Sequence, residues 1–353
     1  MDIFTITNQG IEKSATLELN AIKATIKKTD TNVIEANLEN NQILSYLKSC
    51  QAPRRVLAAI DKSEDHTKLE LNNFNLKDFF TNEKSFKIEV EGVKGQDNRV
   101  AIAKNFATKL FNKLKEQNIN PQLELKNPDF LVIIYFNQNK YFLGIDLLNE
   151  INLREYRVFP HPASFKGDFA FNILINSKFK KEDKLLSAMF KDGVIAIEAA
   201  TYANNIQLNN LDNLNNFPIF QNQKTNPPPS GKKQTTIYGF DTSNQNLTSA
   251  KKNASIAGVK ELVDLKKYSF DDLDVRFNKD FFDNVIFHIT KKDEDQINEI
   301  FYQVSYILKS GGIFSIITRS TLDLSLSSKF ALLEKIELVR GDSKLTQWVA
   351  KKN

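Results

Sequence analysis

The sequence predicts an α/β protein built from two successive parts. Up to residue 157, short strands alternate with short helices, and one strand is almost wholly apolar, which is typical of a small α/β domain. From residue 179 onward a strand-then-helix unit repeats, and such repeats specify a mostly parallel, doubly wound sheet with helices on both faces. With a connecting helix between them, the predicted domains are 1–65, 66–157, 158–178 and 179–353.

The composition excludes several kinds of site. Cys50 is the only cysteine of the 353 residues, so internal disulfides and thiolate zinc sites are excluded. With His66, His161 and His288 as the only histidines, we expect no metal. No segment reaches the roughly 18 uncharged apolar residues that cross a bilayer, and the opening lacks a signal-peptide pattern, so we expect no membrane association and a cytoplasmic location. The net charge of +5 permits a nucleic-acid partner without requiring one.

Up to residue 157, sequence patterns predict strands and helices in the following order. "DIFTIT" and "TNVIEANL" have extended character, and each is followed by an amphipathic helix, at 10–22 and 41–50. After "TNEKS" the strand "FKIEVEGV" has apolar residues at every second position. Residues 98–117 then predict a helix with one apolar stripe, and residues 121–148 predict three strands. The stripe comprises Val100, Ile102, Phe106, Leu110 and Leu114.

The second part predicts three strand-and-helix units and a final strand. The strands are "KLLSAMF", "TIYGFD", "FFDNVIFHIT" and "IFSIITRS", and "LKSGG" before the last strand predicts a turn. Between the first two units, residues 204–233 are rich in asparagine and end in "NPPPSGKK", which predicts a polar surface loop. In such a sheet a ligand binds at the carboxyl ends of the strands.

A series of motifs resembles one known family over nearly the whole chain. These motifs are "GIEKSATLEL", then "NPDFLVIIYFNQNKYFLGIDLL", then "LREYR", then "HPASFKGDFAFNIL". In this order they resemble RNA methyltransferases that join a THUMP RNA-binding domain to an S-adenosylmethionine domain, and among them the tRNA guanine-N2 methyltransferases. The resemblance implies a ferredoxin-like domain at 1–65, a THUMP domain at 66–157, a linker helix at 158–178 and a Rossmann-like class I methyltransferase domain at 179–353. It implies tRNA as the partner and S-adenosylmethionine as the cofactor.

Candidate RNA-binding residues lie at the boundary between the two parts. Arg154 and Arg157 flank Tyr156, and a basic pair with an aromatic ring suits contact with phosphate and stacking on an RNA end. Ion pairing on the surface is the alternative for these arginines. Lys166 on the linker and four lysines of the preceding helix are further candidates for contact with RNA phosphates. A solvent-exposed helix face is the alternative for these four lysines. These lysines are Lys104, Lys109, Lys113 and Lys115.

The first cofactor motif departs from the family pattern. Family members read Asp-Pro-x-Cys-Gly-Ser/Thr-Gly before Ile-Glu-Ala, whereas this chain reads "SAMFKDG" from Ser187 to Gly193. Lys191 replaces the first glycine and Phe190 precedes it, so we expect side chains to occupy space that the cofactor needs. The candidate cofactor-binding residues are Ser187, Asp192, Gly193 and Asp241.

Asp241 ends the next strand, where a carboxylate commonly accepts hydrogen bonds from ribose hydroxyls, and a helix-capping aspartate is the alternative. The motif that receives the target amine is also changed. Family members that methylate an exocyclic amine place Asp or Asn, then Pro, Pro and an aromatic residue after the fourth strand of the sheet. The corresponding positions here are His288, Ile289, Thr290 and Lys291. His288 is the candidate catalytic residue because a neutral imidazole accepts one hydrogen bond, with a structural histidine as the alternative.

Two hypotheses follow from these patterns. The first is a methyltransferase that acts on tRNA guanine N2 and uses Asp241 for the ribose. The second is an RNA-binding protein with the same scaffold, which has lost catalysis and acts as a scaffold or with a partner, such as a small helper subunit. Loss of both the glycine loop and the target-amine motif favours the second hypothesis, while the order of the motifs favours the family assignment for either.

Overall fold

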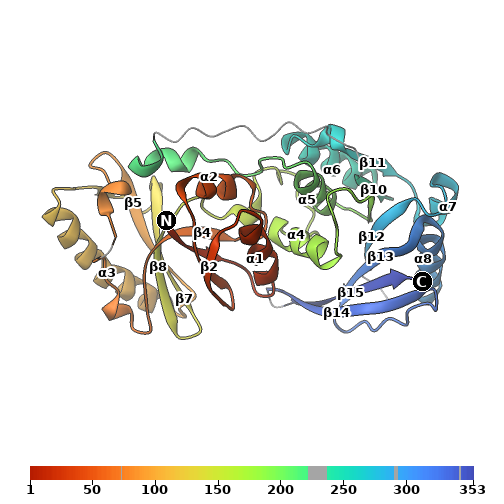
Figure 1. Ribbon diagram of the computed structural model, residues 1–353, viewed down its shortest axis with the longest axis horizontal. Coiled ribbons are helices and arrows are strands. Elements are labelled where there is room, and N and C mark those ends of the chain that lie inside the picture. The colour runs from red at the N-terminus through yellow and green to blue at the C-terminus, as the bar shows by residue number, and fades with distance from the viewer. Residues whose placement is uncertain (73, 222–236, 290–292, 342) are drawn as a thin grey trace. The chain divides into compact units, whose positions relative to one another are not determined.

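The computed structural model describes residues 1–72, 74–221, 237–289, 293–341 and 343–353, and the chain divides into two compact units (Figure 1). Unit 1 comprises Met1–Asn152 and Asn209–Pro227, and unit 2 comprises Leu153–Leu208 and Pro228–Asn353. None of the described helices is long and apolar enough to cross a membrane.

Unit 1 contains one eight-stranded sheet in the order β2-β3-β1-β4-β8-β7-β5-β6. β5 pairs in parallel with β6 and β7, and the other neighbours are antiparallel. The two predicted domains at 1–65 and 66–157 therefore share a single sheet. Its strands are β1 (Asp2–Ile6), β2 (Thr25–Asp30), β3 (Val33–Asn37), β4 (Arg55–Ser63), β5 (Ser85–Glu91), β6 (Gln122–Leu123), β7 (Phe130–Asn137) and β8 (Lys140–Asp146).

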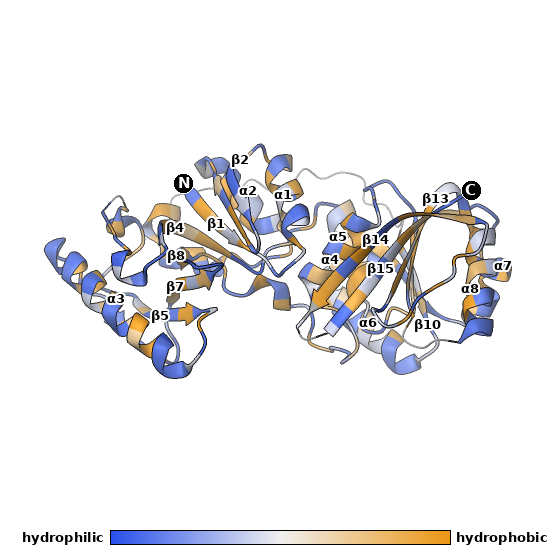
Figure 2. Cartoon of the chain, turned by 90° about the horizontal axis from the view of Figure 1, so that it is seen from below, coloured by the Kyte–Doolittle hydropathy of each residue, from blue (hydrophilic) through white to orange (hydrophobic). Residues whose placement is uncertain are grey.

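Within the described part of unit 1, three α-helices accompany this sheet: α1 (Glu12–Ala21), α2 (Asn40–Ser49) and α3 (Gln96–Glu116). A capping box formed by Glu39 and Gln42 satisfies main-chain N–H groups where α2 begins. α3 buries Ile102, Phe106, Leu110 and Leu114 as its stripe predicts, whereas Val100 is exposed. In Figure 2, hydrophilic residues, coloured blue, occur along the length of α3.

Close packing joins the two halves of this sheet between β4 and β8. Gly144 pairs with Ala59, and a Cβ added to Gly144 would lie 2.6 Å from the Ala58 carbonyl oxygen. A side chain at residue 144 would therefore separate the strands. Phe4 and Phe142 pack edge to face beside this junction, within a cluster that includes Leu57 and Ile133.

Part of the asparagine-rich segment is packed, which corrects the predicted surface loop. Phe217 is fully buried against Phe130, and the Asn213 and Asn216 side chains donate hydrogen bonds to main-chain carbonyls of Leu147 and Asp129. These asparagine amides donate hydrogen bonds to carbonyls near the ends of unit 1 strands. A segment that is rich in polar residues is therefore packed here rather than exposed. Residues 222–233, including "NPPPSGKK", lie outside the described residues.

Unit 2 contains a seven-stranded sheet in the order β11-β10-β9-β12-β13-β15-β14. The first five strands are parallel, as the repeated strand-and-helix pattern predicts, and β15 runs antiparallel to β13 and β14. The strands are β9 (Leu185–Ala188), β10 (Ile237–Asp241), β11 (Val263–Lys267), β12 (Phe282–His288), β13 (Leu308–Arg319), β14 (Phe330–Arg340) and β15 (Ser343–Lys352).

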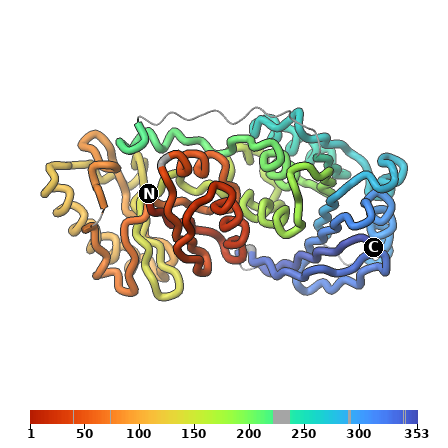
Figure 3. The backbone as a smooth tube through the Cα atoms, in the orientation of Figure 1, coloured from red at the N-terminus to blue at the C-terminus, as the bar shows by residue number. Residues whose placement is uncertain are grey.

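Several predictions for this unit were incomplete or wrong. The "LKSGG" segment is not a turn, because β13 begins at Leu308 and runs through both glycines. β11 was not predicted. The hairpin of β14 and β15, which is coloured blue in Figure 3, was not predicted either. The predicted connecting helix at 165–176 is confirmed as α4, which spans Gly167–Asn176 inside the linker 158–178.

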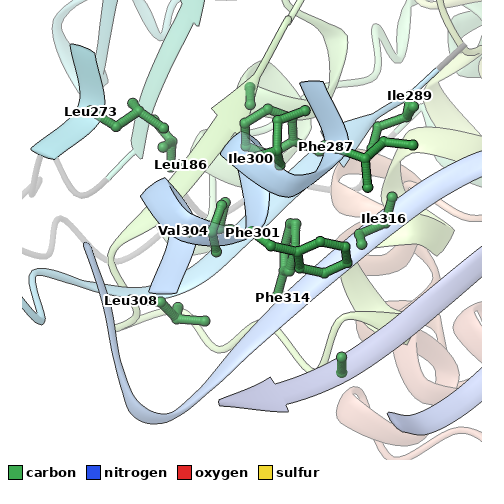
Figure 4. Packing of buried hydrophobic residues seen from close by; sticks show 14 of the residues in the cluster. Leu186, Leu273, Phe287, Ile289, Ile300, Phe301, Val304, Leu308, Phe314 and Ile316 are labelled. Carbon is green, nitrogen blue, oxygen red and sulfur yellow. The ribbon is translucent and has the colours of Figure 1, made fainter. Parts of the chain in front are cut away.

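The helices of unit 2 cover both faces of its sheet. They are α4, α5 (Val194–Ala203), α6 (Asn244–Ile256), α7 (Leu273–Arg276) and α8 (Glu294–Ile307). Alternate residues of β13 point to opposite faces. Phe314 packs against Phe301 of α8, with ring centroids 5.7 Å apart (Figure 4), whereas Ser315 accepts a hydrogen bond from Gln347 in the network around α4.

We predict that Phe314→Ala lowers the free energy of unfolding by about 3–5 kcal/mol, because it removes a buried ring from the cluster shared by β13 and α8. Urea unfolding followed by circular dichroism measures this change. Leu332→Ala removes a side chain that is 47% exposed and serves as the control, with an expected change within about 0.5 kcal/mol. Equal effects of both substitutions would contradict the assignment of this core.

Candidate functional site

The carboxyl ends of β9, β10 and β12 meet at the point where the strand order reverses. β9 has β10 on one side and β12 on the other, because the chain moves outward to β11 and then returns across β9. Open α/β sheets bind ligands in the crevice at such a switch point. The structure brings together here the loop after β9, Asp241 at the end of β10 and His288 at the end of β12.

The loop after β9 keeps a shape that normally requires glycine. Met189, Lys191 and Gly193 all have positive φ, at 53°, 57° and 83°, and two of these three residues carry side chains. A left-handed conformation costs a residue with a side chain about 1–2 kcal/mol. The loop is fixed by hydrogen bonds from Phe190 N to the Phe240 carbonyl oxygen and from Gly193 N to the Phe190 carbonyl oxygen, at 3.2 and 2.9 Å.

Lys191 bridges the cofactor loop and the fourth-strand position. Its Nζ lies 2.6 Å from Nδ1 of His288 and 3.1 Å from the carbonyl oxygen of Ala163. A lysine ammonium only donates hydrogen bonds, so Nδ1 of His288 is the acceptor in this contact. The lone pair that His288 would offer to a target amine is therefore used by Lys191. This contact favours the structural alternative for His288, whose catalytic role stays a prediction.

Asp241 has its carboxylate oxygens occupied by the protein. Oδ2 accepts a hydrogen bond from the main-chain N–H of Lys191 at 2.9 Å. Oδ1 accepts from Ser243 N at 2.9 Å and from Asn246 Nδ2 at 3.0 Å. The residue is 2% exposed, so it ties the cofactor loop to the start of α6. Ser243, rather than Asp241, caps α6, so the helix-capping alternative is wrong, and the ribose contact of Asp241 stays a prediction.

Asp192 was predicted to contact the cofactor, but it is fully buried and contacts the segment before α4. Its Oδ2 accepts hydrogen bonds from Arg157 Nη2 at 2.9 Å and from His161 N at 3.1 Å, and its Oδ1 accepts one from Ser164. Asn253 of α6 reinforces this segment by bonding both the N–H and the carbonyl of Phe159. Asp192 thus holds residues 157–164 against the loop.

Arg154 and Tyr156 form a second buried cluster with Glu198 of α5. Arg154 donates from Nε and Nη2 to Glu198 at 2.8 and 3.0 Å, and the Tyr156 hydroxyl donates to the same carboxylate at 2.6 Å. Burial alone would lower the pKa of Arg154. The charges and hydrogen bonds of its neighbours, Glu198 above all, together outweigh burial, so the pKa of Arg154 lies above its ordinary value. Burial and then the Glu198 charge raise the pKa of Tyr156 well above its ordinary value.

These contacts correct the predicted RNA-binding role of Arg154 and Tyr156. Both side chains are buried and bonded to Glu198, so they do not present charge or a ring to RNA in this structure. Arg157 is also committed, because it pairs with Asp192. Residues 154–157 therefore hold their segment of the chain against α5 and the loop before it. The retained Glu198 in the sequence was the signal that could have indicated this pairing, because a buried carboxylate requires a partner.

The remaining predicted site residues lie in different surroundings. Ser187 is buried inside β9, paired with Gly239 and Ile286, so it does not reach the end of the strand. Gly193 caps α5, and a Cβ there would lie 2.9 Å from the Ala250 Cβ. Lys166 is exposed where α4 begins, and its RNA contact stays a prediction. Thr290 and Lys291 of the fourth-strand motif lie outside the described residues.

A cleft of about 670 Å³ opens beside His288 at the ends of β12 and β13. The sequence analysis missed two cations in its wall, Arg319 and Lys344, because they lie 25 residues apart on strands that pair only in the folded sheet. None of the described lining residues is acidic, although Lys344 also pairs with Glu337 at 3.2 Å. The lining residues are Pro162, Ala163, His288, Arg319, Ser320, Thr321, Ser343, Lys344 and Leu345.

The residues at the switch point fit S-adenosylmethionine, the cofactor that the resemblance implies, in part. Ribose hydroxyls need a carboxylate with an open acceptor position, and the buried Asp241 keeps one, because Oδ2 receives a single donor and Oδ1 receives two. The space between the loop and β12 holds the Lys191 side chain, and Phe190 is buried against Gly239. Among the described residues, no group of three His, Cys, Asp or Glu side chains could hold a metal ion.

Two family models match the chain. The model described as "RMKL-like, methyltransferase domain" matches residues 154–347, which is more than half of the chain, and the THUMP domain model matches residues 61–146. The first match contains the buried clusters and the switch point described above, and the second lies inside unit 1.

Relatives that are similar in sequence include two named tRNA (guanine(6)-N2)-methyltransferase. The one from Methanocaldococcus jannaschii is 27% identical over 175 residues, which are 47% of this chain and 46% of the relative. The one from Archaeoglobus fulgidus is 22% identical over 262 residues, which are 72% of this chain and 59% of the relative. The matched regions thus span about half of the length of these relatives.

Solved structures show the same fold over the full chain. A structure of SMU.472, described as a putative methyltransferase complexed with SAH, has a TM-score of 0.72 at 17% identity and covers 100% of this chain and 98% of its own. TrmN from Thermus thermophilus has a TM-score of 0.69 at 14% identity, with coverages of 100% and 99%. At these identities the likeness concerns the fold alone.

We predict that Glu198→Ala lowers the free energy of unfolding by about 3–5 kcal/mol, because it leaves the Arg154 guanidinium buried without its carboxylate. Chemical denaturation measures this change. Glu334→Ala breaks an exposed pair with Lys178 and is the matched control, with an expected effect of about 0–1 kcal/mol. If the two variants unfolded alike, the buried cluster would not carry the assigned role.

Proposed function

Because the chain belongs to the RMKL-like methyltransferase domain family and also carries a THUMP domain, we propose that it binds tRNA. The observation that carries this proposal is the presence of both domains on one chain, similar to relatives named as tRNA methyltransferases. Both hypotheses drawn from the sequence share this RNA partner. A tRNA-directed role agrees with the cytoplasmic location expected from the sequence, and a helper subunit stays a prediction.

The charge distribution of α3 supports the RNA-binding part of the proposal. From Asn98 to Lys115 the helix contains five basic residues and no acidic one. Lys109 does not face solvent freely, because it bonds the carbonyl oxygens of Thr67 and Leu69, and Lys113 pairs with Glu116. Lys104 and Lys115 are exposed, and together with Arg99 they offer positive charge to a phosphate backbone.

The cleft beside His288 supports a nucleic-acid ligand for unit 2 as well. Arg319 and Lys344 place two cations at its wall, and Ser320 and Thr321 add hydroxyl groups. Cations with hydroxyls are the usual partners of phosphate and sugar oxygens. These contacts have no sequence preference of their own, so they suit RNA positioning rather than base selection.

Methylation of tRNA guanine N2 with S-adenosylmethionine is the second candidate function. Family membership and the names of the relatives favour it, and Asp241 and Glu198 are retained at matching positions. The closed loop and the use of His288 Nδ1 by Lys191 argue against it. Binding without methyl transfer is therefore the function that the site geometry favours.

We predict that the wild-type protein shifts tRNA in a gel, and that Arg99→Gln/Lys104→Gln/Lys115→Gln weakens the affinity about tenfold or more at low salt. Three phosphate contacts would be lost, so the slope of log K against log salt should fall by about 2–3. Lys27→Gln/Lys28→Gln is the control, because these exposed lysines already pair with Asp2 and Asp30. Equal weakening by both sets would rule out α3 as the RNA surface.

We predict no transfer of labelled methyl groups from S-adenosylmethionine to unmodified tRNA above the level of a no-enzyme blank. The physical reason is the Lys191 side chain, which lies between the two motifs and bonds His288. The Asp241→Ala variant is assayed alongside. Incorporation by the wild type that is lost in Asp241→Ala would establish the second candidate function instead.

A further inference from the structure

A basic side chain spans the gap between the two motifs on which methyl transfer depends. The donor methyl group must lie between the loop after the first strand and the residue that receives the target amine. Lys191 occupies that gap, since its main-chain N–H bonds Asp241 and its Nζ bonds His288 and Ala163. The same residue therefore contacts Asp241, His288 and the segment before α4.

The fold around this side chain retains the outline of an open loop. Gly193 and the positive φ angles of Met189 and Lys191 preserve the backbone path that glycines would give. Glu198 and Asp192 fix the start of α5 by buried ion pairs, independently of Lys191. Removing the Lys191 side chain therefore leaves the surrounding frame in place.

We infer that the Lys191 side chain is an internal occupant of the cofactor cleft, and that truncating it restores binding of an adenosyl ligand. The main-chain N–H of residue 191 still bonds Asp241 after such a truncation, so the gain comes from the space that the side chain leaves. The inference shares one premise with the proposed function, namely that the chain belongs to the methyltransferase domain family. It does not depend on tRNA binding.

The test is isothermal titration of the full chain with S-adenosylhomocysteine, which needs no turnover. Wild type, Lys191→Gly and Lys191→Ala are compared, since the alanine variant removes the amine but keeps the left-handed backbone and the Cβ. Both variants should bind at least about tenfold more tightly than wild type. Adding Asp241→Ala to Lys191→Gly should abolish the gain.

Lys178→Gly is the matched control. Lys178 has a φ of 56°, close to that of Lys191, but it follows α4 and pairs with the exposed Glu334. Lys178→Gly relieves a similar left-handed backbone conformation and should not create adenosyl binding. Melting curves of every variant establish that each is folded.

Two results would overturn the inference. One is wild-type binding of S-adenosylhomocysteine as tight as that of the variants, and the other is absence of binding by both folded Lys191 variants. The tRNA gel shift is run on the same samples and reports on the proposed function separately. Loss of adenosyl binding with an intact tRNA shift, or the reverse, therefore distinguishes the failure of one proposal from the failure of the other.

Discussion

The arrangement of unit 2 around its switch point depends on two buried carboxylates at the start of α5. Glu198 receives Arg154 and Tyr156, and Asp192 receives Arg157, Ser164 and the main chain of His161. Neither carboxylate is exposed, so each requires these donors to offset its removal from water. The residues that the sequence suggested for RNA contact are thus used to hold residues 154–164 beside the cofactor loop.

This frame explains how the cofactor loop keeps its path without the usual glycines. The backbone takes left-handed conformations at Met189 and Lys191, which is unfavourable for residues with a Cβ, and the surrounding contacts maintain it. Once the path is fixed, the Lys191 side chain reaches His288, and its N–H reaches Asp241. The Lys191 side chain then lies between the cofactor loop and β12, while the architecture of the family is unchanged.

The sequence was informative wherever a pattern was local. The apolar stripe of α3, the parallel strand-and-helix units and the glycine-poor loop with Lys191 were all readable because periodicity and motif register do not need tertiary contacts. The Arg154–Glu198 pair and the Arg319 and Lys344 cleft depend on residues 44 and 25 positions apart, so only the folded chain brings them together. The asparagine-rich segment was misjudged because its amides bond main-chain carbonyls of unit 1.

The central claim is that Lys191 and His288 are in contact where an adenosyl cofactor is expected. A crystal structure of the wild-type protein grown with millimolar S-adenosylhomocysteine tests it most directly. The account predicts that Lys191 Nζ stays within hydrogen-bond distance of His288 Nδ1 and that no adenosyl density lies beside Asp241. Ordered ligand density with its ribose on Asp241, and Lys191 displaced from His288, would contradict it.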